Sequence, residues 1–171
     1  RQWPPGNRRH DHRGVGDNHG QREPDREGVH DDVVAVARKR RPADDRRLVR
    51  RKSFTMGEMT CDEAADTLDL LGHDFLLFAN LATGADAVVF YGEDQGLELI
   101  DASGREDAIA TDTVVPVRLS HRGTPRCTVE EAAVQINVDV LPFVFHLDPT
   151  TERGSVVYRR YDGHYGVITP A

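Results

Sequence analysis

The sequence predicts an α+β fold of two tandem β-α-β-β-β modules, each a small antiparallel-rich sheet with one helix, paired about a pseudo-twofold axis. The first observation behind this prediction is an internal repeat. Sliding the sequence against itself by 68 residues aligns 59–100 with 127–168 without a gap, and ten of the 42 aligned positions are identical. The second observation is that helix-start signals, apolar runs and turn signals follow one another in the same order in both copies.

Each copy is expected to open its helix with a capping box. Residues 60–63 and 128–131 both read Thr-x-x-Glu, in which the hydroxyl and the carboxylate satisfy unpaired backbone amides reciprocally. Apolar side chains then recur at helical spacing, which predicts one buried stripe per helix. The residues of these stripes are Ala64, Leu68 and Leu71 in the first copy and Val129, Ala132, Ala133, Ile136 and Val140 in the second.

Strands are predicted on both sides of each helix. Short runs rich in aromatic and β-branched residues follow the helices and are too short to be helices themselves. These runs are 75–78 and 88–91 in the first copy, and 143–145, 156–158 and 165–168 in the second, where Asp162-Gly163 predicts a hairpin turn. One further strand is expected before each helix, around 48–54 and 114–119.

Composition divides the chain into four segments. The first 32 residues contain only Trp3, Val15 and Val29 as large apolar groups, too few to offset the entropy of ordering them. We therefore expect 1–47 to be a disordered or loosely docked basic linker. The two modules are expected at 48–103 and 114–171, with an acidic connecting loop at 104–113.

Charge is unevenly distributed along the chain. Residues 1–52 hold 15 Arg and Lys against 9 Asp and Glu, whereas residues 53–171 hold 7 against 20. A basic leader joined to an acidic body is typical of a nucleic-acid contact at one end, although a solvated linker explains it equally well. The candidate RNA-contacting residues are Arg38, Lys39, Arg40, Arg41, Arg46, Arg47, Arg50, Arg51 and Lys52.

Other classes of protein find little support. Two cysteines form no CxxC motif, no apolar run reaches the length of a membrane span, and no signal segment opens the chain, which favours a cytoplasmic protein without a membrane partner. His73-Asp74 is a candidate acid–base pair, but a position at a helix C-terminus beside Gly72 explains it better. No ligand spacing unites Cys61, Cys127, His73 and His121 into a metal site. We expect no enzyme activity and no cofactor.

Two runs of residues resemble a known family. Leu71-Gly72-His73-Asp74-Phe75 and 157–170, which reads VYRRYDGHYGVITP, resemble the C-terminal module of long-form ribosome hibernation promoting factors of the sigma-54-modulation type. A tandem arrangement is similar to the dormancy-associated forms of that family. The two copies each depart from the pattern: the second lacks the Gly-His-Asp step, and the first lacks the Arg-Arg-x-Asp-Gly step.

The resemblance implies a function. A hibernation factor inhibits translation under stress by binding the small ribosomal subunit through an N-terminal domain, which residues 1–32 do not supply and which we expect upstream of Arg1. The present region would then be the self-association module and a possible extra anchor to ribosomal RNA. The alternatives are a stand-alone association module that regulates another factor, or a small RNA-binding protein that uses residues 38–52.

The aromatic and β-branched strand residues are the candidate module-pairing surface. A small module with an open sheet edge is expected to pair with its own likeness, here as an internal pseudo-dimer, with a homodimer as the alternative. A base-stacking platform is the competing interpretation of the same aromatics. The predicted interface residues are Phe75, Phe78, Val89, Phe90, Tyr91, Phe143, Phe145, Val157, Tyr158 and Tyr165.

Overall fold

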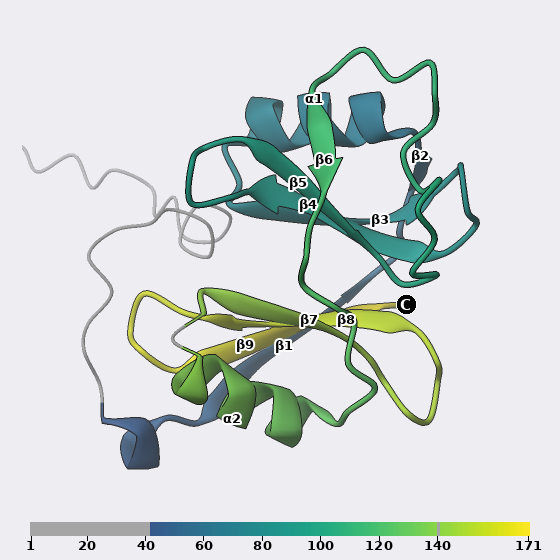
Figure 1. Ribbon diagram of the computed structural model, residues 1–171. Helices are drawn as coiled ribbons and strands as arrows, with labels where there is room; N and C mark the ends of the chain where they lie inside the picture. The colour runs from purple at the N-terminus through teal and green to yellow at the C-terminus, as the bar shows by residue number, and fades with distance from the viewer. Residues whose placement is uncertain (1–41, 140) are drawn as a thin grey trace, which may run out of the picture.

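The computed structural model describes residues 42–139 and 141–171. Within this part of the chain, two helices and nine strands form four layers: a helix, a sheet, a second sheet and a second helix. Figure 1 shows α1 lying over the upper sheet and α2 under the lower one, so that the two sheets face each other in the middle. The predicted α+β class with tandem modules is confirmed.

The elements follow the predicted order, with one short strand added before the first helix. In chain order they are η1 (Ala43–Asp45), β1 (Leu48–Phe54), β2 (Glu58–Met59), α1 (Cys61–Leu71), β3 (Phe75–Asn80), β4 (Asp86–Tyr91), β5 (Leu97–Asp101), β6 (Val117–Leu119), α2 (Val129–Val138), β7 (Phe143–Leu147), β8 (Gly154–Arg159) and β9 (Tyr165–Pro170).

Both helices begin with the predicted capping box. The Thr60 hydroxyl accepts from the Glu63 amide at 3.2 Å, and the Glu63 carboxylate accepts from the Thr60 amide at 2.9 Å. Thr128 and Glu131 repeat the arrangement at 3.2 and 2.8 Å. Since each box satisfies two backbone donors that a helix start leaves unpaired, both starts are defined by the local sequence.

Each sheet has an antiparallel centre, which parallel strands flank on both edges of the first sheet and on one edge of the second. The first sheet has the order β2-β3-β4-β5-β6, and the second has the order β1-β9-β8-β7. Neighbouring strands β3, β4 and β5 are antiparallel, as are β7, β8 and β9. The outer pairs β2–β3, β5–β6 and β1–β9 are parallel.

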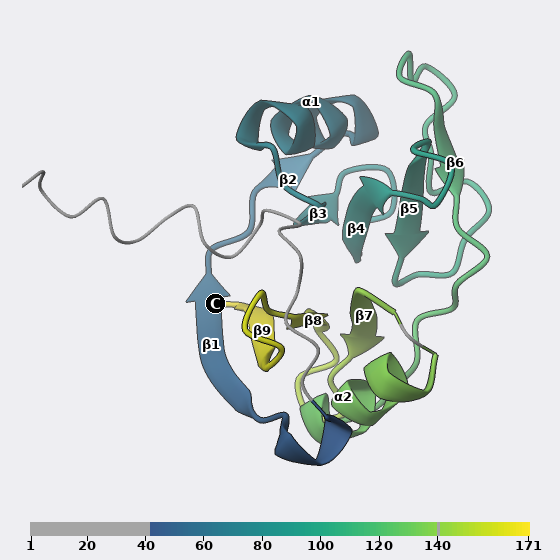
Figure 2. The ribbon, with the colours of Figure 1, turned by 90° about the vertical axis from the view of Figure 1, so that its left-hand side faces the viewer.

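The two sheets exchange their parallel edge strands. β1, which precedes the first helix, pairs with β9 of the second copy, and β6, which precedes the second helix, pairs with β5 of the first copy. The registers match across the repeat, because Arg51 opposes Val167 just as Leu119, 68 residues later, opposes Leu99. In Figure 2, β1 runs alongside β9 in the lower sheet before the chain rises to β2 and α1. The sheets therefore do not coincide with the predicted segments 48–103 and 114–171.

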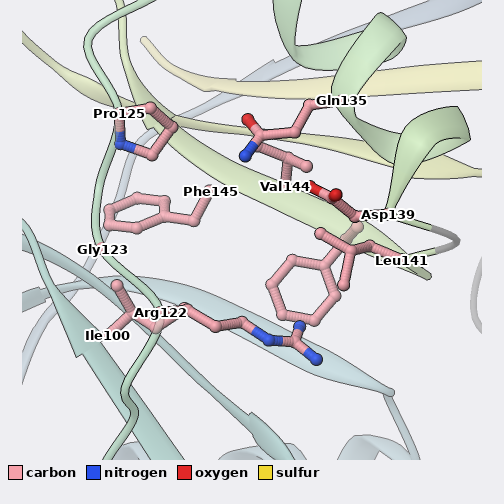
Figure 3. Close-up of a pocket in the computed structure, with 10 residues that line it drawn as sticks. Ile100, Arg122, Gly123, Pro125, Gln135, Asp139, Leu141, Val144 and Phe145 are labelled. Atoms are coloured by element: carbon pink, nitrogen blue, oxygen red, sulfur yellow. The ribbon is translucent and has the colours of Figure 1, made fainter.

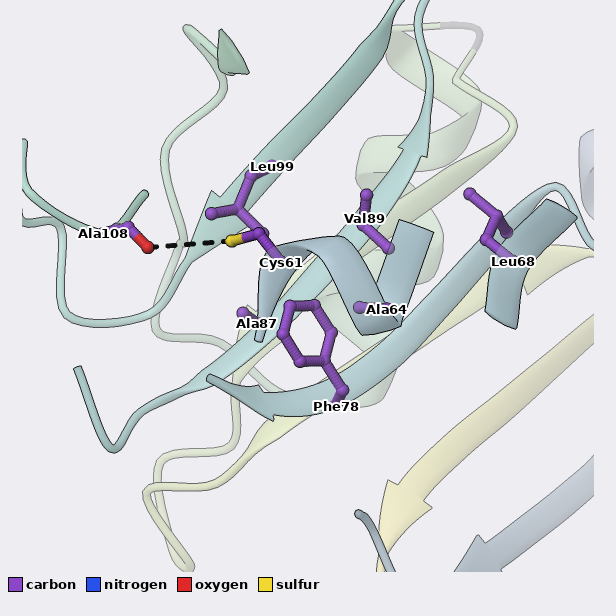
Figure 4. Close-up of a cluster of buried hydrophobic side chains, with 8 residues drawn as sticks. All are labelled: Cys61, Ala64, Leu68, Phe78, Ala87, Val89, Leu99 and Ala108. Atoms are coloured by element: carbon purple, nitrogen blue, oxygen red, sulfur yellow. Dashed lines mark hydrogen bonds between the residues drawn. The ribbon is translucent and has the colours of Figure 1, made fainter. Parts of the chain in front are cut away.

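Each helix covers the outer face of one sheet. Under α1, a first core gathers Leu68, Phe78, Val89 and Leu99 (Figure 4). Cys61 is buried in the same cluster, and its thiol donates to the Ala108 carbonyl at 3.8 Å. Burial raises the pKa of the Cys61 thiol, and the nearby Asp101 raises it further.

A second core under α2 repeats the first. Its buried residues are Ala132, Ile136, Val144, Val157, Tyr165 and Val167. Ile136, Val157 and Val167 occupy the positions that Leu68, Val89 and Leu99 hold in the first core. The equivalent of Phe78 is His146, which is fully buried and has its Nδ1 2.8 Å from the Cys127 carbonyl. Burial lowers the pKa of His146, so this imidazole is held neutral in the fold.

Arg118 fastens the exchanged strand β6 to the first sheet. Its guanidinium donates to both Asp94 carboxylate oxygens at 2.7 Å and to Glu98 at 2.8 Å. Hydrogen bonds from Arg118, with a smaller contribution from the Gly96 amide, lower the pKa of Asp94 to about 2. The pKa of Glu98 is also lowered, chiefly by Arg118. The second copy thus contributes both the strand and its electrostatic clamp.

Replacing Arg118 with Met should release this clamp. The pKa of Asp94 is then expected to rise from about 2 toward the ordinary 3.8, as followed by a carboxylate NMR titration. Because the folded pKa is lowered, the clamp stabilises the fold above pH 3.8 and loses its effect as the pH falls toward 2. Amide exchange at Ser120, whose N–H donates to the Leu99 carbonyl, should become faster.

Arg105→Met is the matched control. Arg105 pairs with Asp107 in the exposed loop that precedes β6, so its loss removes an arginine–aspartate pair without touching Asp94. An unchanged Asp94 pKa in Arg118→Met, or an equal change in Arg105→Met, would contradict the assignment.

Candidate functional site

The inner layer, defined as the buried contact between the facing sides of the two sheets, is the candidate functional site. Its buried residues come from both copies of the repeat: Leu77, Val88, Phe90, Ile100, Phe143, Phe145, Val156 and Tyr158. Phe54, Met56, Phe75, Ala102 and Ile168 pack against this cluster. Side chains alternate between the two faces of a strand, so each sheet presents one apolar row to its helix and another to the opposite sheet.

Three aromatic contacts form the centre of the inner layer. The Phe75 and Phe143 rings, which are equivalent in the repeat, have centroids 5.0 Å apart. Phe143 meets Phe90 edge-on at 5.1 Å, and Phe75 meets Tyr158 at 5.9 Å. The 68-residue offset relates Phe75 to Phe143 and Phe90 to Tyr158, so the last two contacts are equivalent to each other. The pseudo-twofold axis therefore passes close to the Phe75–Phe143 pair. Such geometries add about 0.5–1.5 kcal/mol per pair to the burial itself.

Five of the predicted interface residues lie in the inner layer. Phe90, Phe143, Phe145 and Tyr158 are buried there, and Phe75 is partly buried against them. Their rings are closed off between the sheets, which removes them from any base-stacking surface.

The other five predicted interface residues lie elsewhere. Phe78 and Val89 belong to the first core, and Val157 and Tyr165 belong to the second. They are one residue out of phase with the inner row and therefore face a helix instead. Tyr91 lies at the outer end of β4, is 38% exposed, and donates to Asp69 at 3.4 Å.

A partly buried ion pair joins the two sheets beside the aromatic centre, with the Asp86 carboxylate buried and the Arg153 side chain 48% exposed. Asp86 of β4 accepts from Arg153 Nε at 2.9 Å and from its terminal nitrogen at 3.1 Å. The Gly154 amide of β8 donates to the same carboxylate at 2.6 Å. Asp86 is only 8% exposed, so these three donors replace the water that its charge has lost. The partners are 67 and 68 residues apart in the chain, and their sequence neighbourhoods gave no signal of the contact.

A cavity of about 260 Å³ opens at the rim of the inner layer. Figure 3 shows Ile100 and Arg122 on its lower side, Phe145 and Val144 above them, and Asp139 and Leu141 at the far end. Arg122 lies over the Phe90 ring, with its guanidinium carbon 5.6 Å from the ring centroid. The lining offers apolar walls, one guanidinium, one carboxylate and one amide, and pairs no nucleophile with a base. Its chemistry is that of packing or binding.

The predicted basic segment is only partly described. Arg38, Lys39, Arg40 and Arg41 lie outside the described residues. Arg47, Arg51 and Lys52 are exposed, whereas Arg46 and Arg50 are half-buried, and Arg46 donates to Asn137 of α2. Arg51 approaches Glu130 at 4.0 Å across an exposed surface, a pair that contributes little to stability. Arg47, just before the exchanged strand β1, and Arg51 and Lys52 within it therefore remain accessible.

The family-like run at the C-terminal hairpin anchors β1. The Arg47 amide donates to His164 Nδ1 at 3.1 Å, and the Arg47 carbonyl accepts from the Tyr165 amide at 2.9 Å. The Tyr165 hydroxyl donates to Asn137 at 2.6 Å. Gly163, with φ of +83°, makes the turn between β8 and β9. These residues hold the entering strand in place.

The Leu-Gly-His-Asp-Phe run ends the first helix. Gly72 adopts the left-handed conformation with φ of +63°, and the His73 amide donates to the Leu68 carbonyl at 3.2 Å. His73 therefore lies at a helix C-terminus, as expected. Cys61 lies in the first core and Cys127 beside the second. Over 42–139 and 141–171 the structure contains no cluster of three or more His, Cys, Asp or Glu suited to a metal ion, and no helix long and apolar enough to span a membrane.

Truncation of the central aromatic should test the inner layer. Phe143→Ala removes a ring that contacts two others and is 4% exposed, so we expect a loss of about 3–5 kcal/mol in the free energy of unfolding. Urea denaturation of the whole chain measures this loss.

Tyr91→Ala is the control, because it removes an aromatic ring at the outer end of β4 in the first sheet. Its loss is expected to stay below about 1 kcal/mol, because the ring is exposed and its hydroxyl contact is long. Similar losses for the two variants would show that the inner layer carries no special share of the stability.

The comparisons with known proteins agree with this geometry. The family described as "Sigma 54 modulation/S30EA ribosomal protein C terminus" matches the chain twice, at residues 43–99 and 115–167. Each match begins just before the exchanged strand, β1 or β6, and ends within β5 or β9.

Curated relatives fall within the same group of proteins. A "Dormancy associated translation inhibitor" of Mycobacterium tuberculosis, in strains CDC 1551 / Oshkosh and H37Rv, is 34% identical over 129 residues, covering 72% of this chain and 47% of the relative. A "Ribosome hibernation promotion factor" of Picosynechococcus sp. is 42% identical over 53 residues, covering 31% of this chain and 28% of that protein.

The chain spans about half the length of the mycobacterial relatives that it matches. The two family matches, by contrast, cover most of the chain described by the structure, and they fall on its two structural repeats. The chain therefore belongs to the sigma 54 modulation/S30EA ribosomal protein C-terminal family, with two copies of the family's module in tandem.

Proposed function

We propose that this chain is the self-association region of a ribosome-associated translation inhibitor of the hibernation type. The observation that carries the proposal is the inner layer, in which the two modules of one chain bury their pairing faces against each other. Membership of the family supports the ribosomal context, as do the names of the relatives, one a dormancy associated translation inhibitor and the other a ribosome hibernation promotion factor.

The internal pairing has a mechanistic consequence. When two modules are joined by a short connection, the effective concentration of one module around the other is in the mM range. This is far above the concentration of a second chain in the cell. The parallel strands β1 and β6 add backbone hydrogen bonds between the copies to the apolar contact. A factor of this kind satisfies its pairing surface within one polypeptide, so it silences single ribosomes and does not couple two of them.

The ribosome itself would be contacted outside the inner layer. In this proposal the small subunit is bound by a domain encoded upstream of Arg1, and the factor acts in the cytoplasm. The accessible Arg47, Arg51 and Lys52, together with the basic residues 38–41, form an additional anchor to ribosomal RNA. The described body is otherwise acidic, which disfavours RNA lying on the sheets.

Light scattering on the full chain tests the internal pairing. We expect a mass near 19.1 kDa from low to high micromolar concentration, because the inner faces of the two described modules already cover each other. A stable mass of twice that value at micromolar concentration would show that the modules pair between chains, and the single-ribosome mechanism would then fail.

Cosedimentation with ribosomes at rising salt tests the RNA anchor. If the anchor exists, ribosome binding by the chain should weaken steeply with salt, and replacing Arg47 and Arg51 with Gln should flatten that dependence. The matched control replaces Arg105 and Arg126 with Gln, which removes the same charge at exposed sites outside the basic segment. Salt-insensitive binding would indicate protein contacts, and absence of cosedimentation would favour an association module for another factor.

A further inference from the structure

Asp86 and Gly154 are equivalent positions of the repeat, and they face each other across the inner layer. The offset of 68 residues carries one onto the other, and the Gly154 amide lies 2.6 Å from the Asp86 carboxylate. A Cβ added to Gly154 would lie 2.7 Å from the Asp86 Cβ. The two positions therefore lie close to the pseudo-twofold axis, as Phe75 and Phe143 do. The axis relates two identical residues at Phe75 and Phe143, whereas it relates an aspartate to a glycine at 86 and 154.

The charge around the axis is asymmetric as well. Arg153, which neutralises Asp86 with a two-pronged contact, corresponds to Ala85 in the first copy. The first module thus contributes a buried acid and no base, whereas the second contributes a base and no acid. Each copy supplies what the other lacks.

The packing around the axis is complementary in the same way. Gly154 leaves room for the Phe145 ring, whose nearest carbon would be 2.6 Å from a Cβ at position 154. The equivalent of Phe145 is the smaller Leu77, and beside it the first copy carries Asp86 in place of glycine. The larger ring and the missing side chain belong to one module, and the smaller side chain and the acid belong to the other.

We propose that Asp86, Arg153 and Gly154 form a selector that makes each module fit the unlike module of its own chain and reject a like module of another. A pair of first modules would bring two buried Asp86 carboxylates together with Ala85 in place of the arginine. A pair of second modules would oppose two Gly154 residues and leave both Arg153 side chains without Asp86. Since the selector refines the internal pairing, it depends on the proposed function.

Gly154→Asp in the full chain recreates the like-charge contact of a first-module pair. The measurement is the equilibrium constant for unfolding in urea, together with the mass of the chain. Gly154→Ala is the matched control, because it introduces the Cβ that Phe145 and Asp86 must accommodate but adds no charge. We expect the folding equilibrium constant of Gly154→Asp to be lower than that of Gly154→Ala by a further factor of about ten or more.

The double variant Asp86→Asn and Gly154→Asp distinguishes the effect of the added charge from the effect of the added side-chain volume. Removing one of the two facing charges should restore most of the difference between Gly154→Asp and Gly154→Ala, even where Gly154→Asp alone does not fold. The selector is overturned if Gly154→Asp is no less stable than Gly154→Ala, or if the double variant is no more stable than Gly154→Asp. A wild-type chain that is already a dimer would instead refute the internal pairing, so the two failures are distinguishable.

Discussion

The apolar inner face of each sheet is shielded from solvent by the inner face of the other sheet. Over the residues that the structure describes, each sheet carries a helix on its outer face alone, and its inner row of apolar side chains, with Phe75 and Phe143 at the centre of the contact, is covered by the other sheet. A module of this size has a marginal core, so leaving such a face in water would cost it stability. The pairing is therefore part of the fold, and the exchanged strands and the Asp86–Arg153 contact are arranged around it.

Much of the fold could be predicted because its determinants are local. The two Thr-x-x-Glu boxes define helix starts, Gly72 and Gly163 supply left-handed turns, and the 68-residue offset aligns the strands in register. Each of these signals spans a few residues and has a direct physical cause. Because of the repeat, an element predicted in one copy is also predicted at the equivalent positions of the other copy, even where sequence identity is low.

The candidate site was predicted only in part, because the decisive contacts are long-range. Phe75, Leu76, Leu77 and Phe78 are all apolar, so alternation could not reveal which of them face the helix and which face the other sheet. Strand exchange was equally hidden, since the repeat makes both sheets suitable partners for β1. The Asp86–Arg153 pair joins turn and strand-end residues, where a charge is ordinarily solvated.

The strand exchange also constrains the order of events during synthesis. Arg47 and His164, whose contact closes the second sheet, are 117 residues apart, so β1 leaves the ribosome long before the strand it will join. Its edge stays unpaired until both repeats have been made, and an unpaired edge can meanwhile associate with other chains. Slow elongation through the second repeat would lengthen the time for which this edge is exposed. The first described strand of the fold is thus the last to find its partner.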